Sequence, residues 1–434
     1  AVGMNALTAN TTGDRNTAFG QGSLAANTTA DSNTAVGQDA LAVNTTGHSN
    51  TAVGKGVMAA NTTGHSNVAV GQAALDANDE GFNNTAVGED ALGANTSADY
   101  NTAVGRMALT TVTTQGNLTA FGASALYANT TGAYGVAVGY NALAANTTAD
   151  GNTAVGYVAL TANTTGTKNV AVGAFALDSN TTADRNTALG YEAMTVSTTG
   201  ANNTAVGSYA LTALTTGGDN TAMGDYALGS ATTGSYNTGI GKNAIDNLTT
   251  GSNNTAVGRN ALTTITTGND QTAFGFEALK ANTTGSNNIG IGCSALTANT
   301  TGSGNVAMGK HNMLANTTGG YNVALGYYNL VASNSSGNVA VGTQVLEDLT
   351  SGDYNVGVGY KCLNATTTGQ YNVSMGMDAV RYTTTGSSNT GLGARALYQN
   401  TTANDNTAIG AWALDANTTG SNNVGVGASA LGAN

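Results

Sequence analysis

A period of 17 residues runs through the whole sequence. If the glycine of the recurring string "AVG" is taken as position 0, it falls at Gly3 and then at every 17th residue to Gly326. After one 16-residue interval it returns at Gly342 and continues to Gly427, which makes 26 copies in 434 residues. A repeat this short cannot bury an apolar face alone and must stack on its neighbours. We therefore expect a single continuous array over residues 1–434, without linkers.

Both ends of the sequence fall inside a repeat. Solenoid proteins usually close their ends with atypical capping repeats. We therefore expect the sequence to be the ordered part of a longer chain, or a unit that stacks end to end.

The three positions before the glycine alternate in character. Position −3 is Thr, Val or Ile, position −1 is always apolar, and position −2 is always Ala, Gly or Ser. This alternation predicts a short β-strand, and we expect its apolar −3 and −1 face to point inward. The small side chains at −2 indicate close approach to a second surface. That surface is either a neighbouring chain or the opposite wall of the same thin coil.

The charged residues predict where the turns lie. Every Lys and Arg falls at position +1, +2, +5 or +12, whereas position +4 is Leu, Met, Ile or Val. Charged side chains are rarely buried without a partner, so the first set faces solvent and position +4 enters the core. The pattern predicts an all-β fold, a parallel β-solenoid (β-roll) of about 25 coils with 17 residues each, whose strands pair ~4.8 Å apart.

The string "N-T/V-A-V-G-x-x-A-L" resembles the head repeats of trimeric autotransporter adhesins and the repeats of related phage and bacterial fibre proteins. The resemblance implies a left-handed β-roll, a homotrimer and a role in attachment. This repeat is three residues longer, and its "NTTG" segment lies outside the shared motif. We expect an extracellular fibre or filament shaft at a cell or virion surface. It would self-associate as a homotrimer or end to end, and its turns would contact a host surface or carbohydrate.

Asparagine occupies two positions. At −4 it occurs in nearly every copy, which favours a ladder of amides along the solenoid axis. At +7 it begins "Asn-Thr-Thr" glycosylation sequons, but Leu214 and Ile265 occupy the same position, so we expect +7 to point inward. The sequons at Asn83 and Asn202 lie on the exposed turn and are the candidate glycosylation sites.

Aromatic and threonine side chains suggest an alternative function, a ligand-binding array. Ranks of Thr at +8 and +9 could bind ice, although adjacent Thr residues send their hydroxyls to opposite faces and favour local hydrogen bonds. Asn-x-Thr sequons and tyrosines on polar edges could make a glycan-coated or glycan-binding fibril. The candidate contact residues are Tyr100, Tyr140, Tyr157, Tyr327, Tyr328, Tyr360 and Trp412.

We expect no catalytic, metal or cofactor site, and hence no enzyme. The chain has three histidines, of which His48 and His65 share position +11 without a pattern of ligating carboxylates. Cys293 and Cys362 lie four coils apart, roughly 20 Å, too far for a disulfide. A net charge of −12 makes nucleic acid an improbable partner, and no apolar run approaches the ~18 residues of a membrane span.

Overall fold

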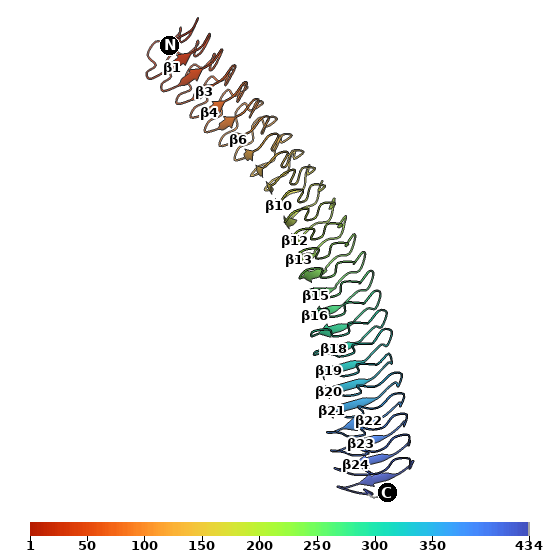
Figure 1. The fold of residues 1–434 in the computed structure, drawn as a ribbon. Coiled ribbons are helices and arrows are strands. Elements are labelled where there is room, and N and C mark those ends of the chain that lie inside the picture. Colours follow the sequence, from red (N-terminus) through yellow and green to blue (C-terminus); the bar gives the residue numbers. More distant parts are fainter. Residues whose placement is uncertain (433–434) are drawn as a thin grey trace. The chain divides into compact units, whose positions relative to one another are not determined.

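The computed structural model describes residues 1–432, which are all-β. The contacts divide the chain into two compact units, Ala1–Asp219 and Asn220–Asn434. Each unit is a parallel β-solenoid with one short strand per coil (Figure 1). The predicted fold class is therefore confirmed, whereas the left-handed winding and the continuity of the array from residue 1 to 434 stay predictions.

The first unit holds β1 to β12. Their bounds are β1 (Thr17–Phe19), β2 (Thr34–Val36), β3 (Thr51–Val53), β4 (Val68–Val70), β5 (Thr85–Val87), β6 (Thr102–Val104), β7 (Thr119–Phe121), β8 (Val136–Val138), β9 (Thr153–Val155), β10 (Val170–Val172), β11 (Thr187–Leu189) and β12 (Thr204–Val206).

The second unit holds β13 to β25. Their bounds are β13 (Thr221–Met223), β14 (Thr238–Ile240), β15 (Thr255–Val257), β16 (Thr272–Phe274), β17 (Ile289–Ile291), β18 (Val306–Met308), β19 (Val323–Tyr327), β20 (Val339–Thr343), β21 (Val356–Tyr360), β22 (Val373–Met375), β23 (Thr390–Leu392), β24 (Thr407–Ile409) and β25 (Val424–Val426).

Within each unit, every strand pairs in parallel with the strand one repeat later, so equivalent residues stand beside each other. Thr34 pairs with Thr51 at the usual separation of 17, and Val323 pairs with Val339 across the 16-residue coil. The short coil keeps this register because it loses its residue in the corner after +8. There the Asn334 side-chain oxygen accepts hydrogen bonds from the backbone N–H groups of Thr317 and Thr318.

The two faces of the strand are the reverse of our expectation. Position −2 is buried, with Ala154 fully inaccessible, whereas Phe19 at −1 is 58% exposed. A Cβ added to Gly239 at −2 would lie 3.3 Å from Leu228 Cγ, which follows Gly224 at position +4 and lies on the opposite wall of the same turn. The opposite wall of the same coil is thus so near that only Ala, Gly or Ser fits at −2. The prediction that −3 and −1 face inward is wrong, because the thin coil has no room for them.

Two amide ladders run through the buried interior. At +7, Asn61 Nδ2 donates to Asn44 Oδ1 at 2.8 Å, and Asn78 Nδ2 donates to Asn61 Oδ1 at 2.7 Å. At −4, the backbone N–H of Asn50 donates to Asn33 Oδ1 at 2.9 Å. The predicted amide ladder and the inward direction of +7 are both confirmed, and Leu214 and Ile265 are fully buried at +7.

The glycine at position 0 marks the closest approach of neighbouring coils. Gly190 has φ of 146°, and a Cβ placed there would collide with the carbonyl oxygen of Gly207. A larger residue would therefore be strained in its backbone and would also separate two coils. This explains why position 0 is glycine in all 26 copies.

Candidate interaction surfaces

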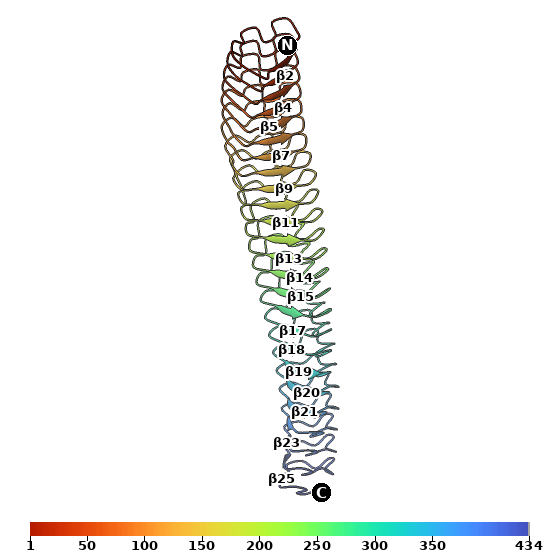
Figure 2. The ribbon, with the colours of Figure 1, turned by 90° about the vertical axis from the view of Figure 1, so that its left-hand side faces the viewer.

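The strands stand one above another along each unit (Figure 2). Their −3 and −1 side chains point out of the coil, where they are half-buried or exposed, and form a strip that we call the apolar strip. It contains Thr, Val, Ile, Leu, Met and Phe and no charged residue in any of the 25 strands. At ~4.8 Å per strand, the 12 strands of the first unit expose a strip on the order of 500 Å². Its −1 side chains are all apolar, whereas most of its −3 side chains in the first unit are threonines. A patch of this size is often a functional surface.

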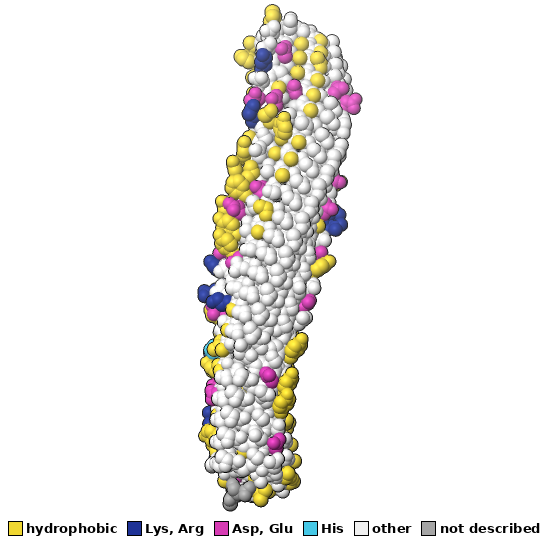
Figure 3. Space-filling view, turned by 90° about the vertical axis from the view of Figure 1, so that its right-hand side faces the viewer, with side chains coloured by type: hydrophobic (Ala, Val, Ile, Leu, Met, Phe, Trp, Pro, Cys, Tyr) yellow, Lys and Arg dark blue, Asp and Glu magenta, His cyan; other side chains and the backbone are white. Residues whose placement is uncertain are grey.

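The face turned away from the strands is mostly polar and uncharged, with charged side chains along its margins (Figure 3). The threonines at +8 bond between coils, because Thr45 Oγ1 donates to the Thr62 carbonyl at 3.2 Å and Thr164 Oγ1 to the Thr181 carbonyl at 3.1 Å. The threonines at +9, such as Thr46, are exposed. The expected local hydroxyl bonds are therefore present at +8, and a single exposed rank remains at +9.

An aromatic row lies on the turn after the strands of the first unit. Tyr140 and Tyr157 stack at 5.5 Å, and Phe175, Tyr191 and Tyr209 extend the row with centroid separations of 5.4 to 6.1 Å. Two of these residues, Tyr140 and Tyr157, were predicted contacts. Phe175, Tyr191 and Tyr209 were not among the predicted contacts, because the row combines residues at positions +1 and +2 and no single position of the repeat contains it.

The other predicted contact residues do not gather in one place. Tyr100 meets Phe82 at the end of a stack that begins with His48 and His65. Tyr328 is only half-buried rather than exposed, because its ring packs between Tyr327 and His311. The predicted contact residues that are more than two-fifths exposed are Tyr100, Tyr140, Tyr157, Tyr327, Tyr360 and Trp412. Their role in binding stays a prediction.

The candidate glycosylation sites, Asn83 and Asn202, are both exposed. Each lies in the left-handed backbone region, with φ of 56° and 60° respectively. Their modification stays a prediction.

A groove of about 490 Å³ in the second unit was not anticipated from the sequence. Tyr382 and Tyr398 meet in it at 5.0 Å, with their hydroxyl oxygens 3.4 Å apart. The guanidinium of Arg395 stacks between the rings of Tyr398 and Trp412, at 4.0 and 4.3 Å from their centroids. The Tyr382 hydroxyl and the Arg395 guanidinium lower the pKa of Tyr398. These residues occupy positions +2, +5 and +6, so only stacking of the coils brings them together.

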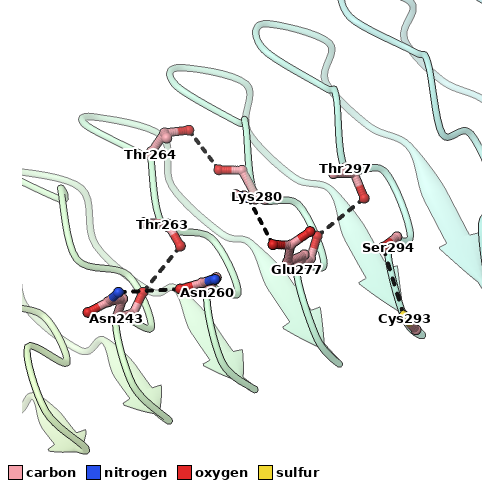
Figure 4. A network of polar contacts seen from close by, with 9 residues as sticks. All are labelled: Asn243, Asn260, Thr263, Thr264, Glu277, Lys280, Cys293, Ser294 and Thr297. Carbon is pink, nitrogen blue, oxygen red and sulfur yellow. Dashed lines mark hydrogen bonds and ion pairs between the residues drawn. The ribbon is translucent and has the colours of Figure 1, made fainter.

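The polar side chains along one edge of the second unit make pairwise contacts, some between neighbouring coils and some within one coil, and do not converge on a site (Figure 4). Asn243 Nδ2 donates to Asn260 Oδ1 at 3.3 Å, and Lys280 Nζ pairs with Glu277 at 2.8 Å and lowers its pKa. Cys293 is exposed beside Ser294, and both cysteines are free thiols. Burial raises the pKa of Cys362 to about 12, which makes it an unreactive thiol.

Residues 1–432 contain no group of three or more metal-ligating side chains. The same residues include no helix with the length and apolarity needed to cross a membrane. The sequence matches no known protein-family model, and no curated protein matches it significantly.

Proposed function

We propose that this chain is a structural shaft of an extracellular fibre or filament, which self-associates through its apolar strip and presents its turns for attachment. The carrying observation is the strip itself, which keeps β-branched and apolar residues outside the coil in every described strand. A solvent-exposed edge or face of a β-sheet ordinarily carries charged side chains, which prevent unwanted association with other chains. The strip carries none, which favours a second copy as its cover. The resemblance to adhesin head repeats supports the same direction.

The area of the strip is compatible with association. Two strips of the first unit, placed face to face, would cover about 1,000 Å², close to the lower limit of a standard protein interface. Since area alone does not set affinity, the mass of the native particle decides the proposal.

The first test is the mass of the native particle by light scattering, compared with 42.6 kDa for one chain. We expect three times this mass for a homotrimer, or an open-ended mass for a filament. Val155→Lys within the strip should reduce the mass, because a cation would be buried in the contact. Thr46→Lys on the exposed +9 rank is the matched control and should leave the mass unchanged. A single-chain mass for the unaltered protein would contradict the proposal.

A second candidate function, an ice-binding array, is favoured by the exposed threonine rank at +9. Thr46 and Thr63 are exposed in successive coils, and the strands that carry the coils repeat every ~4.8 Å. The +8 hydroxyls already donate to backbone carbonyls, which leaves one rank rather than two. A thermal-hysteresis assay separates the two functions. Hysteresis that disappears in Thr46→Lys and Thr63→Lys would favour ice binding over the shaft.

A further inference from the structure

We propose that the groove of the second unit binds a neutral oligosaccharide, with Tyr382 and Tyr398 as stacking surfaces. The site is separate from the apolar strip and does not depend on self-association. It draws side chains from four successive coils, after β21, β22, β23 and β24. The groove of about 490 Å³ lies within the usual range of ligand sites, ~300–1,000 Å³.

The chemistry of the lining selects this ligand class. The polar and aromatic lining consists of Tyr382, Thr384, Tyr398, Gln399, Thr401 and Thr418, none of which carries a charge at neutral pH. Tyrosine rings offer flat apolar faces with a polar end, and a sugar ring offers a C–H face surrounded by hydroxyls. The lining thus matches both parts of a sugar. The two guanidiniums beside the groove are occupied: Arg381 pairs with Asp378 at 3.0 Å and packs 5.2 Å from the centroid of Tyr382, and Arg395 packs 4.0 Å from the centroid of Tyr398. They support the rings, so the surface offered to a ligand is the neutral lining.

The hydroxyls and the amide of the groove complement sugar hydroxyl groups. Thr384 Oγ1 donates to the Thr401 carbonyl at 3.2 Å, and Thr401 Oγ1 donates to the Thr418 carbonyl at 3.1 Å. Because their protons are already committed, these two oxygens remain as acceptors for sugar O–H donors. Gln399 is exposed and supplies both an amide donor and an acceptor.

The aromatic surfaces are held in place before any ligand binds. The rings of Tyr382 and Tyr398 meet edge to face, with an interplanar angle of 74°. Arg395 is a positioning residue, because its guanidinium packs on Tyr398 and is itself covered by Trp412. Among residues 1–432, no carboxylate lies within 4 Å of Arg395 to draw it away from the rings. A preset site avoids part of the entropic cost of binding.

The fluorescence of Trp412 can report binding at this site, because Trp412 is the only tryptophan in the chain. We would titrate the full-length protein with cellohexaose, xylohexaose, maltohexaose and chitohexaose, following Trp412 fluorescence and the heat of binding by calorimetry. At least one neutral hexaose should give a saturable signal by both methods. Its affinity should stay constant between 50 and 500 mM salt, because no charge pairing contributes.

Three variants test the assignment. Tyr398→Ala and Tyr382→Ala should each weaken binding about threefold to tenfold, the loss expected for one aromatic contact. Tyr398→Phe keeps the ring and should retain most of the affinity, which guards against a general loss of folding. Tyr140→Ala removes an exposed aromatic side chain from the first unit and should leave the affinity unchanged.

Two results would overturn the proposal. One is the absence of a calorimetric signal with all four hexaoses at millimolar concentration, with the protein shown to be folded by circular dichroism. The other is binding of oligogalacturonate alone, with affinity that falls steeply as salt rises, since this would show that a cation rather than the neutral lining selects the ligand. Self-association could persist in either case, so the two proposals fail independently.

Discussion

At the scale of single residues, the amide ladder at +7 ends wherever its next member is not asparagine. Asn180 and Asn316 are buried, and the Oδ1 atom of each has no hydrogen-bond partner. In the following coil, position +7 is Ser197 and Ser333 respectively, and neither reaches back to the amide. The hydroxyl of Ser197 is also unpaired. These two interruptions therefore leave a buried acceptor unsatisfied, which costs free energy. Where Val112 follows Asn95, by contrast, Asn95 Oδ1 accepts a hydrogen bond from the backbone N–H of Ala98 at 3.2 Å.

Ser197→Asn should extend the ladder by one coil and raise the free energy of unfolding by about 1 kcal/mol. The new amide can donate to Asn180 Oδ1, as Asn61 does to Asn44. Ser197→Ala is the control, since it removes the unpaired hydroxyl without adding a donor and should change stability less. Urea unfolding followed by circular dichroism measures both. Equal stability of the two variants would show that the ladder contributes nothing at this position.

Asp246→Asn should stabilise the protein at pH 7, by up to about 0.5 kcal/mol after allowance for screening by water. Burial, and secondarily the charge of Asp225, raises the pKa of Asp246 above its ordinary 3.8. A raised folded pKa contributes stability below pH 3.8 that is lost as pH rises through the folded value. The advantage of the variant should therefore vanish near pH 3. Urea unfolding at pH 7 and pH 3 checks this, and an equal difference at both values would refute it.

At the scale of the strand, side-chain volume rather than hydropathy decides which face is inside. The period, the position of the strand and the inward direction of +4 and +7 could be predicted from the sequence. Charged residues and aliphatic residues occupy different positions of the repeat, which separates exposed positions from buried ones. The two strand faces could not be distinguished this way, since neither carries a charge. The larger apolar face lies outside because Leu228 approaches the −2 position of Gly239 too closely for Val or Phe.

The groove could not be predicted for a different reason. Its tyrosines, Tyr382 and Tyr398, occupy positions +6 and +5 of successive coils. A comparison of one repeat position at a time separates them, although their rings touch once the coils are stacked. A contact between different repeat positions in neighbouring coils can be predicted only when the register of the coils and the geometry of their turns are known. The amino-acid composition supplies neither.

Ala154→Leu tests the tight packing of the −2 face. Ala154 is fully buried, so the larger side chain should force the coil walls apart and lower stability by roughly 1–3 kcal/mol or more. Tyr157→Ala, three residues later, removes a side chain that is 52% exposed and should cost less than 1 kcal/mol. Thermal unfolding of the two variants compares them. A Leu variant as stable as the unaltered protein would contradict the assignment of −2 to the interior.

At the scale of the whole molecule, the free energy of unfolding of a unit should be the sum of a contribution from each repeat and a contribution from each contact between neighbouring repeats. Each strand contacts only the strands one repeat before and after, with the same register. Deleting residues 140–156 removes one complete repeat and joins two equivalent positions, so the variant should fold with a small change in melting temperature. Deleting residues 140–147 breaks the register and should abolish cooperative melting. Circular dichroism distinguishes the two, and equal tolerance of both deletions would contradict a register-dependent fold.

The 16-residue coil shows how the chain absorbs a change of length. Asn334 closes the shortened corner while Val323 and Val339 remain paired, so the missing residue does not change the register of the strands. Slippage during replication, which adds or removes whole repeats in a repetitive gene, would then change only the length of the proposed shaft. The cross-section of each coil would be inherited intact, so length could evolve separately from the surfaces proposed for recognition.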